Sequence, residues 1–184
     1  MAANTGFVIS DTEKLLKARE YKDRGNEAYK KGNFCKAAGS YHRALLYLKG
    51  LSSNCPDLLS SLSGLPQNKG KSPMTQDLMD DARSLTCDCH NNLAACMLKA
   101  SAPKYERIIE HCNFALDASP NNIKALYRKG TSLYAIGDYD GALSAFQMAK
   151  PDANIRKYMD LCKVELKKQD RAIADNFRGM FDIL

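Results

Sequence analysis

Apolar and small residues recur at three- and four-residue spacing along most of this chain, and this spacing predicts amphipathic helices. The clearest stripe follows Pro151, where it is formed by Ile155, Tyr158, Cys162 and Leu166. No run of β-branched residues alternates with polar ones in the way that marks a strand. The pattern therefore predicts an all-α protein.

Local signals set the bounds of these helices. The segment SDTE at 10–13 has the form of a capping box, so the first helix is expected to begin near Asp11 and residues 1–10 to form a flexible N-terminus. Serine, glycine and proline dominate the stretch at about 51–76, which predicts a loop insertion there. The spacing predicts helices over about 11–31, 33–49, 77–98, 105–118, 122–136 and 139–148, and a long one from 153 to about 179.

Two segments of the chain repeat one pattern. In residues 25–34 and again in residues 130–139, a glycine returns after seven positions and an aromatic residue follows two positions later. A middle copy begins with NLAAC at 92–96. Each copy is predicted to be a pair of helices that approach closely, because one slot holds a small residue in all three copies. The residues in that slot are Gly25, Ala94 and Gly130.

Three such copies in order resemble the tetratricopeptide repeat, a unit of about 34 residues that folds as helix–turn–helix. The resemblance covers about 11–150 once the loop insertion is set aside. It implies a right-handed α-α superhelix of three helix pairs. The stripe that starts at Ile155 is then expected to make residues 151–184 a C-terminal capping helix and tail.

Composition adds an expected location and argues against a membrane span. Of the 184 residues, 45% are hydrophobic and 26% are charged, which is ordinary for a soluble globular protein. No apolar stretch approaches the roughly 20 residues that cross a bilayer, and the first residues do not form a secretory signal. Seven cysteines without such a signal indicate reduced thiols in the cytosol or nucleus, and a cytoplasmic location is expected. Four of them are expected to be small core residues: Cys35, Cys96, Cys112 and Cys162.

The residue pattern argues against catalysis. The segment CDCH at 87–90 lacks the spacing of a structural zinc site, and residues two apart on a helix face different directions. His42 and His111 are expected to be ordinary helix residues. The sequence contains no recognisable nucleophile–base pair, glycine-rich phosphate loop or set of metal ligands. The chain is therefore predicted not to be an enzyme and to use no cofactor or metal.

Five polar residues stand on the first helices of the three pairs: Lys22, Asn26, Asn92, Lys124 and Arg128. Lys22 and Asn26 share one helix face as i and i+4, and so do Lys124 and Arg128. Because first helices line the concave surface of such an array, all five side chains are expected to point into one groove. Cations and amides suit a peptide end that carries two carboxylates, the chain terminus and the side chain of a last Asp.

These five residue types at these repeat positions resemble the two-carboxylate clamp of tetratricopeptide co-chaperones. The resemblance implies binding of the Glu-Glu-Val-Asp tail of Hsp90 and of cytosolic Hsp70. Some segments look like the C-terminal domain of large immunophilins: NNLAAC at 91–96, KALYR at 124–128 and GMF at 179–181. Others look like the tetratricopeptide repeat protein 9 family: YHRALL at 41–46, KYER at 104–107 and DANIR at 152–156.

The expected function is that of a non-catalytic adaptor or co-chaperone, which holds a chaperone tail in its groove and a second, unidentified protein client elsewhere. The net charge of +6 favours an acidic peptide. The alternative is a scaffold that binds an internal segment of a cytoskeletal or signalling protein, with the basic residues incidental. Nucleic acid is not an expected partner, because no nucleic-acid-binding motif is present, and membrane insertion is not expected either.

One further segment is basic and amphipathic, with Lys163, Lys167, Lys168 and Arg171 beside apolar residues. Calmodulin or a membrane surface can engage such a helix. The preferred interpretation is the solvated outer face of a capping helix.

Overall fold

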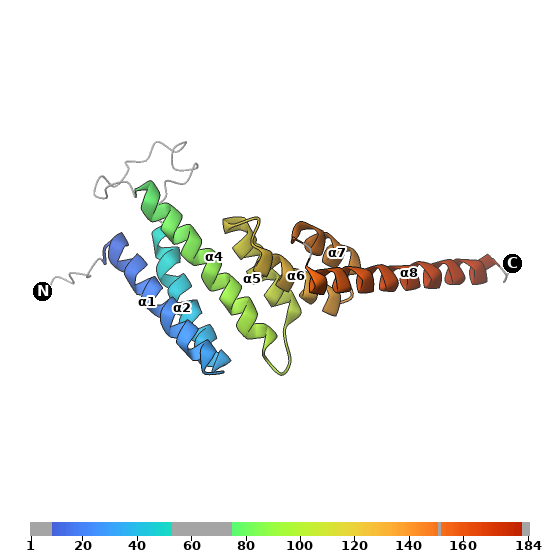
Figure 1. Ribbon diagram of the computed structural model, residues 1–184, viewed down its shortest axis with the longest axis horizontal. Coiled ribbons are helices and arrows are strands. Elements are labelled where there is room, and N and C mark those ends of the chain that lie inside the picture. The colour runs from blue at the N-terminus through green and yellow to red at the C-terminus, as the bar shows by residue number, and fades with distance from the viewer. Residues whose placement is uncertain (1–8, 53–74, 151, 182–184) are drawn as a thin grey trace, which may run out of the picture. The chain divides into compact units, whose positions relative to one another are not determined.

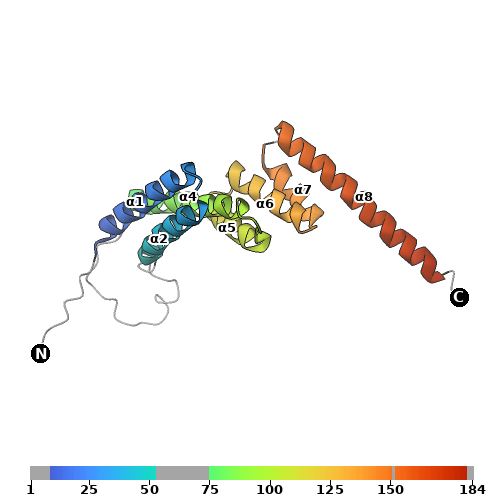
Figure 2. The same cartoon turned by 90° about the horizontal axis from the view of Figure 1, so that it is seen from below.

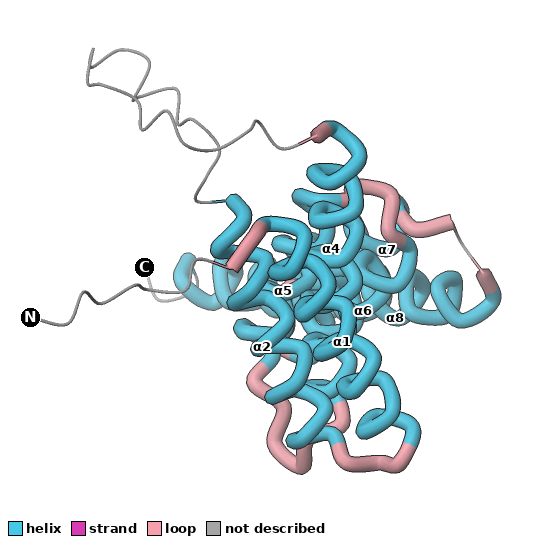
Figure 3. Tube along the Cα trace, turned by 90° about the vertical axis from the view of Figure 1, so that its left-hand side faces the viewer, coloured by secondary structure: helices cyan, strands magenta, loops and turns pink. Residues whose placement is uncertain are grey.

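The computed structural model describes residues 9–52, 75–150 and 152–181, and these ranges contain helices and loops but no strand (Figures 1 and 3). The predicted all-α class is therefore confirmed. Most of the predicted flexible N-terminus and most of the predicted loop at 51–76 lie outside the described residues. The helices are α1 (Asp11–Lys30), α2 (Phe34–Ser52), α4 (Gln76–Leu98), α5 (Tyr105–Ala118), α6 (Ile123–Ala135), α7 (Tyr139–Met148) and α8 (Ala153–Phe181).

The chain divides into two units, one up to Cys96 and one from Met97 on. The first unit holds α1, α2 and most of α4, and the second holds α5 to α8. Each unit has buried clusters of its own.

Helix α1 begins at the predicted capping box and ends at a predicted turn glycine. Ser10 Oγ accepts a hydrogen bond from the amide of Glu13 at 3.2 Å, and the Glu13 carboxylate accepts one from the amide of Ser10 at 3.1 Å. After α1, Gly32 takes a φ of 76°, a left-handed conformation that glycine adopts without strain. This turn sends the chain back along α1 as α2.

Close packing of α1 and α2 depends on Gly25. The buried ring of Tyr41 lies over this position, and a Cβ atom on Gly25 would be only 2.6 Å from a ring carbon. The missing side chain therefore sets how closely the two helices approach. Two clusters complete the core of the first unit, one made by Leu15, Ala18, Ala44, Leu48, Leu51, Leu85 and Cys89, the other by Ala28, Ala37, Tyr41, Leu93 and Cys96.

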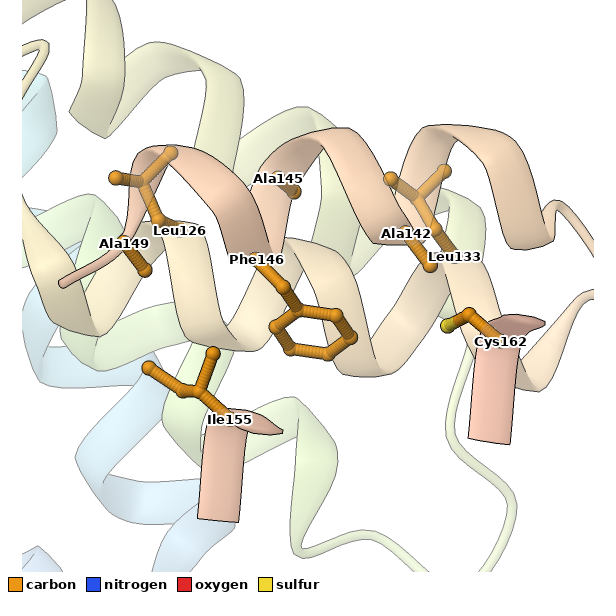
Figure 4. Packing of buried hydrophobic residues seen from close by; sticks show 8 residues of the cluster. All are labelled: Leu126, Leu133, Ala142, Ala145, Phe146, Ala149, Ile155 and Cys162. Carbon is orange, nitrogen blue, oxygen red and sulfur yellow. The ribbon is translucent and has the colours of Figure 1, made fainter. Parts of the chain in front are cut away.

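The second unit repeats this device between α6 and α7. Phe146 lies over Gly130, again with 2.6 Å between a ring carbon and the position of a Cβ on the glycine. Gly137 forms the turn with a φ of 86°. Figure 4 shows the Phe146 ring inside the cluster formed by Leu126, Leu133, Ala142, Ala145, Phe146, Ala149, Ile155 and Cys162.

Helix α8 packs on α7 through residues of the predicted stripe. Ile155 and Cys162 are buried and Tyr158 is partly buried, as the stripe predicts. Figure 2 shows α8 as one uninterrupted helix, and its side chains at 171–178 are exposed. Among the described side chains of α8, those that pack against α6 and α7 lie in its first part.

Two details differ from the sequence-based expectation. Helix α2 runs to Ser52 rather than to about 49, because Leu51 is only 1% exposed and packs in the core of the first unit. Cys35 is exposed instead of buried, since it lies in the first turn of α2 and off the face that carries the buried Ala37 and Tyr41. The prediction of a buried thiol is correct for Cys96, Cys112 and Cys162.

Candidate functional site

Three of the five predicted site residues lie in the first unit, on α1 and α4. Asn26 Oδ1 accepts a hydrogen bond from Asn92 Nδ2 at 3.2 Å and another from the Tyr41 hydroxyl at 2.8 Å. These two bonds hold the Asn26 amide in one orientation, with its Nδ2 group left to donate to another acceptor. The structure thus brings together two of the five residues that the sequence analysis assigns to one groove.

The Tyr41 hydroxyl is a dependable donor in this arrangement. Burial, the largest influence, raises the pKa of Tyr41 well above its ordinary value, so the hydroxyl keeps its proton. Tyr41 also fills the space over Gly25, one position before Asn26. The same ring therefore packs the helix pair and orients a site residue.

Lys22 lies one turn before Asn26 on α1 and bonds to a residue that the sequence-based set omits. Its Nζ donates to Asp88 Oδ2 at 3.0 Å, and Asp88 lies one turn before Asn92 on α4. The two contacts between α1 and α4 thus advance by four residues on both helices. A parallel pair of helices joined by matching i and i+4 positions has this pattern.

The ion pair is accessible to solvent. The Lys22 side chain is 24% exposed and the Asp88 side chain 49% exposed. Both line a hollow of about 360 Å³ between α1 and α4, next to the ion pair of Arg19 with Asp81. Lys22 is consequently within reach of an external anion, although an internal carboxylate already contacts it.

The remaining two predicted residues lie on α6, in the second unit. Asn122 caps this helix by accepting a hydrogen bond from the Ala125 amide at 3.1 Å. Lys124 is exposed and Arg128, one turn later, is partly exposed. Both residues lie within α6 as i and i+4, so they share one face of that helix. That all five residues serve a single ligand stays a prediction.

Two contributors were missed by reasoning from the sequence, namely Tyr41 and Asp88. A signal for Asp88 was present, because it precedes Asn92 by four residues just as Lys22 precedes Asn26. For the Tyr41 hydroxyl there was none, since the repeat pattern explains that aromatic residue by packing alone.

The described ranges offer neither a metal site nor a helix that could span a membrane. No group of three or more His, Cys, Asp or Glu side chains there is arranged to hold a metal ion. Asp88, from the CDCH segment, turns to Lys22, while Cys87 and Cys89 are buried. No described helix is long and apolar enough to pass through a membrane.

Comparison with known proteins gives the chain's relatives. No protein-family model matches the chain. It is 35% identical over 185 residues to tetratricopeptide repeat protein 9C of Xenopus tropicalis, covering 98% of this chain and 99% of that protein. It is also 31% identical over 186 residues to the peptidyl-prolyl cis-trans isomerase FKBP4 of Mus musculus. That match covers 99% of this chain but spans only 36% of the isomerase.

Solved structures share the fold. The C-terminal domain of a Plasmodium falciparum FK506-binding protein, which contains these repeats, has a TM-score of 0.70 and 25% identity over 90% of this chain and 98% of its own. The first repeat domain of Spaghetti (RPAP3), solved with the Hsp90 peptide SRMEEVD, has a TM-score of 0.58 and 15% identity over 83% of this chain and 98% of its own. The predicted repeat fold is thereby confirmed, and the chain belongs to the tetratricopeptide repeat protein 9 family.

Proposed function

We propose that this chain is a non-catalytic, cytoplasmic adaptor that binds the acidic C-terminal tail of Hsp90, of Hsp70 or of both. A second surface engages a further protein client. In this proposal Lys22, Asn26, Asn92, Lys124 and Arg128 together hold the last residue of the tail. The likeness to a repeat domain that was solved with an Hsp90 peptide supports the choice of ligand.

The observation that carries the proposal is the hydrogen bond between Asn26 and Asn92. It fixes two amide groups side by side, one turn along α1 from the ammonium group of Lys22. Amide N–H groups beside a cation form a good site for a carboxylate, because the donors are oriented before the ligand arrives. An asparagine that merely faced solvent would have no such fixed orientation.

Each residue type has a distinct part in the proposed complex. Lys22 and Lys124 supply positive charge, and the planar guanidinium of Arg128 can make two parallel hydrogen bonds to one carboxylate. Asn26 and Asn92 donate to the ligand's oxygens and can accept from its backbone N–H. A terminal Asp presents two carboxylates on one residue, which explains why a chain end would be preferred to an internal acidic segment.

Isothermal titration with a peptide that ends in Glu-Glu-Val-Asp tests the proposal. Lys22→Ala and Arg128→Ala are each expected to weaken binding about ten- to a hundredfold, because each removes a charge-assisted contact. Lys157→Ala is the control, since Lys157 is exposed on α8 and outside the proposed site. Far-UV circular dichroism should be the same for all variants.

A second titration separates terminal recognition from side-on binding. Amidation of the peptide's C-terminus removes one carboxylate and should abolish most of the affinity. Equal binding of the acid and the amide would favour a scaffold that holds internal segments. No binding of the free acid to the wild-type chain would refute the proposal.

A further inference from the structure

The first unit carries a concentration of positive charge between α1 and α2. Four cationic side chains line a hollow of about 320 Å³ there: Arg24, Lys31, Lys36 and Arg43. Glu27 is the one carboxylate among the described residues that line it. We call this hollow the basic groove. It is distinct from the Lys22 hollow, which lies between α1 and α4.

Helix geometry explains why the four cations face one another. Arg24 and Lys31 are seven residues apart, as are Lys36 and Arg43, so each pair lies on one face two turns apart. The tight turn at Gly32 makes α2 run back along α1. The two basic faces therefore lie on the two sides of one groove.

The described residues neutralise the charge of the basic groove only in part. Arg24 pairs with Glu20, but Lys31, Lys36 and Arg43 have no ion-pair partner among the described residues. The guanidinium carbons of Arg24 and Arg43 lie 5.4 Å and 5.9 Å from the centroid of the same Tyr21 ring. The negative face of that ring holds both arginines next to the groove. Like charges gathered in this way attract an anion.

The size and lining of the basic groove restrict what can bind. Its lining runs along α1 from Tyr21 to Lys31, about 15 Å at the rise of an α-helix. That length matches about four or five residues of an extended chain. The small residue Ala28 also lines it, and Ser40 and Asn33 add polar groups. A helix with a wide apolar face would find little to pack against.

We propose that the basic groove binds an extended acidic segment of a partner protein, rich in Asp and Glu side chains. Carboxylates of the segment pair with Arg24 and Arg43 at one end and with Lys31 and Lys36 at the other. Recognition here uses side-chain carboxylates and needs no free C-terminus. The site goes beyond the proposed clamp, and it lies entirely within α1, α2 and the turn that joins them.

Fluorescence anisotropy with a fluorescein-labelled, C-terminally amidated hexaglutamate peptide tests this assignment at low ionic strength. The wild-type chain should bind the peptide, and Lys31→Glu/Lys36→Glu should weaken binding at least about tenfold. The matched control Lys157→Glu/Lys167→Glu makes the same change in net charge on exposed positions of α8 and should stay within about twofold of wild type. Circular dichroism and thermal unfolding show whether the variants fold.

Two further measurements make the outcome decisive. In NMR spectra, the backbone amide resonances that shift when the peptide is added should belong mainly to residues 21–43. The variant Lys124→Ala/Arg128→Ala, which alters the proposed clamp, should bind the amidated peptide as tightly as the wild type does. Binding of the amidated peptide in the basic groove would therefore be detected even if the proposed function of the clamp were refuted. Equal losses in the two double charge reversals, or no binding by wild type, would overturn the proposal. Binding of a phosphoserine peptide with none of hexaglutamate would also overturn it.

Discussion

The ammonium group of Lys22 lies 3.0 Å from a carboxylate oxygen of Asp88. A carboxylate of the chain itself is thus paired with a lysine that we assign to ligand binding. Both side chains are partly exposed, and an ion pair of this kind contributes only about 0.2–1 kcal/mol. A ligand carboxylate can therefore displace Asp88 at small cost. Asp88 would then act as a weak internal competitor that lowers the affinity for acidic tails.

Replacement of Asp88 by asparagine is expected to strengthen binding of a Glu-Glu-Val-Asp peptide by about two- to fivefold, since it removes the competing charge and keeps the shape. Titration calorimetry of Asp88→Asn against wild type measures the effect. Asp81→Asn is the matched control, because Asp81 pairs with Arg19 and not with Lys22. Weaker binding by Asp88→Asn would show that Asp88 positions Lys22 for the ligand.

A methyl group at Gly25 should destabilise the first unit by about 1–3 kcal/mol, since a Cβ would lie 2.6 Å from the Tyr41 ring. The ring cannot easily move, because it is buried and its hydroxyl donates to Asn26. Urea unfolding of Gly25→Ala measures the loss. Gly39→Ala is the control, because position 39 is exposed on α2 and a Cβ there would meet nothing within 4 Å. The higher helix propensity of alanine should then raise stability by about 0.5–1 kcal/mol. Equal stability of the two variants would contradict this account of the close packing.

The helix pairs could be predicted from the sequence because their determinants are local. Gly32 and Gly137 mark turns, and Gly25 and Gly130 mark close contacts, wherever the rest of the chain lies. The end of α2 could not be predicted in this way. Gly50 suggests a stop, but the burial of Leu51 and a bond from Lys14 Nζ to the Gly50 carbonyl, at 3.3 Å, extend the helix. Tertiary packing here overrides propensity.

For the candidate site, the structure shows one expected juxtaposition and one contact that the sequence did not predict. Asn26 and Asn92 were placed together from repeat positions alone, and they are hydrogen bonded. The pairing of Lys22 with Asp88 did not follow from the residue types, because a repeat pattern places donors on a helix face without showing which carboxylate of a neighbouring helix meets them. The use of Lys124 and Arg128 by the same ligand stays a prediction, which the clamp titrations test.

Removal of a buried hydroxyl should stabilise the second unit. Ser132 is fully buried on α6, and its Oγ has no hydrogen-bond partner among the described residues. An unsatisfied buried polar group costs about 1–3 kcal/mol, so Ser132→Ala should raise the urea midpoint without changing the slope. Thr131→Ala is the control, because the Thr131 hydroxyl donates to the Arg128 carbonyl at 3.0 Å and its removal loses that bond. An unchanged or lower midpoint for Ser132→Ala would imply that the hydroxyl is satisfied in solution.

Alkaline pH should weaken the fold through its buried thiols. Burial raises the pKa of Cys112 to about 11, against the smaller opposing effect of the Arg128 charge, and burial raises that of Cys89 to about 12. The ordinary value, which applies to the unfolded chain, is 9.0. Between these values the unfolded chain has lost protons that the folded chain keeps, so stability falls as pH rises from about 9 to about 11. Below about 9 both states hold their protons and the effect vanishes.

The contribution of Cys112 to this loss can be measured by comparing the free energy of unfolding at about pH 8 and about pH 10, in reducing buffer. Ionisation of Cys112 in the unfolded chain accounts for about 1 kcal/mol of the loss. Cys112→Ala should be less stable than wild type at both values but should lose about 1 kcal/mol less between them. Cys35→Ala should follow the wild-type curve, because the Cys35 thiol is exposed to water in the folded chain as well. If Cys112→Ala loses as much stability as wild type, the Cys112 thiol does not resist ionisation in the folded chain, and the burial of this thiol would have to be reconsidered.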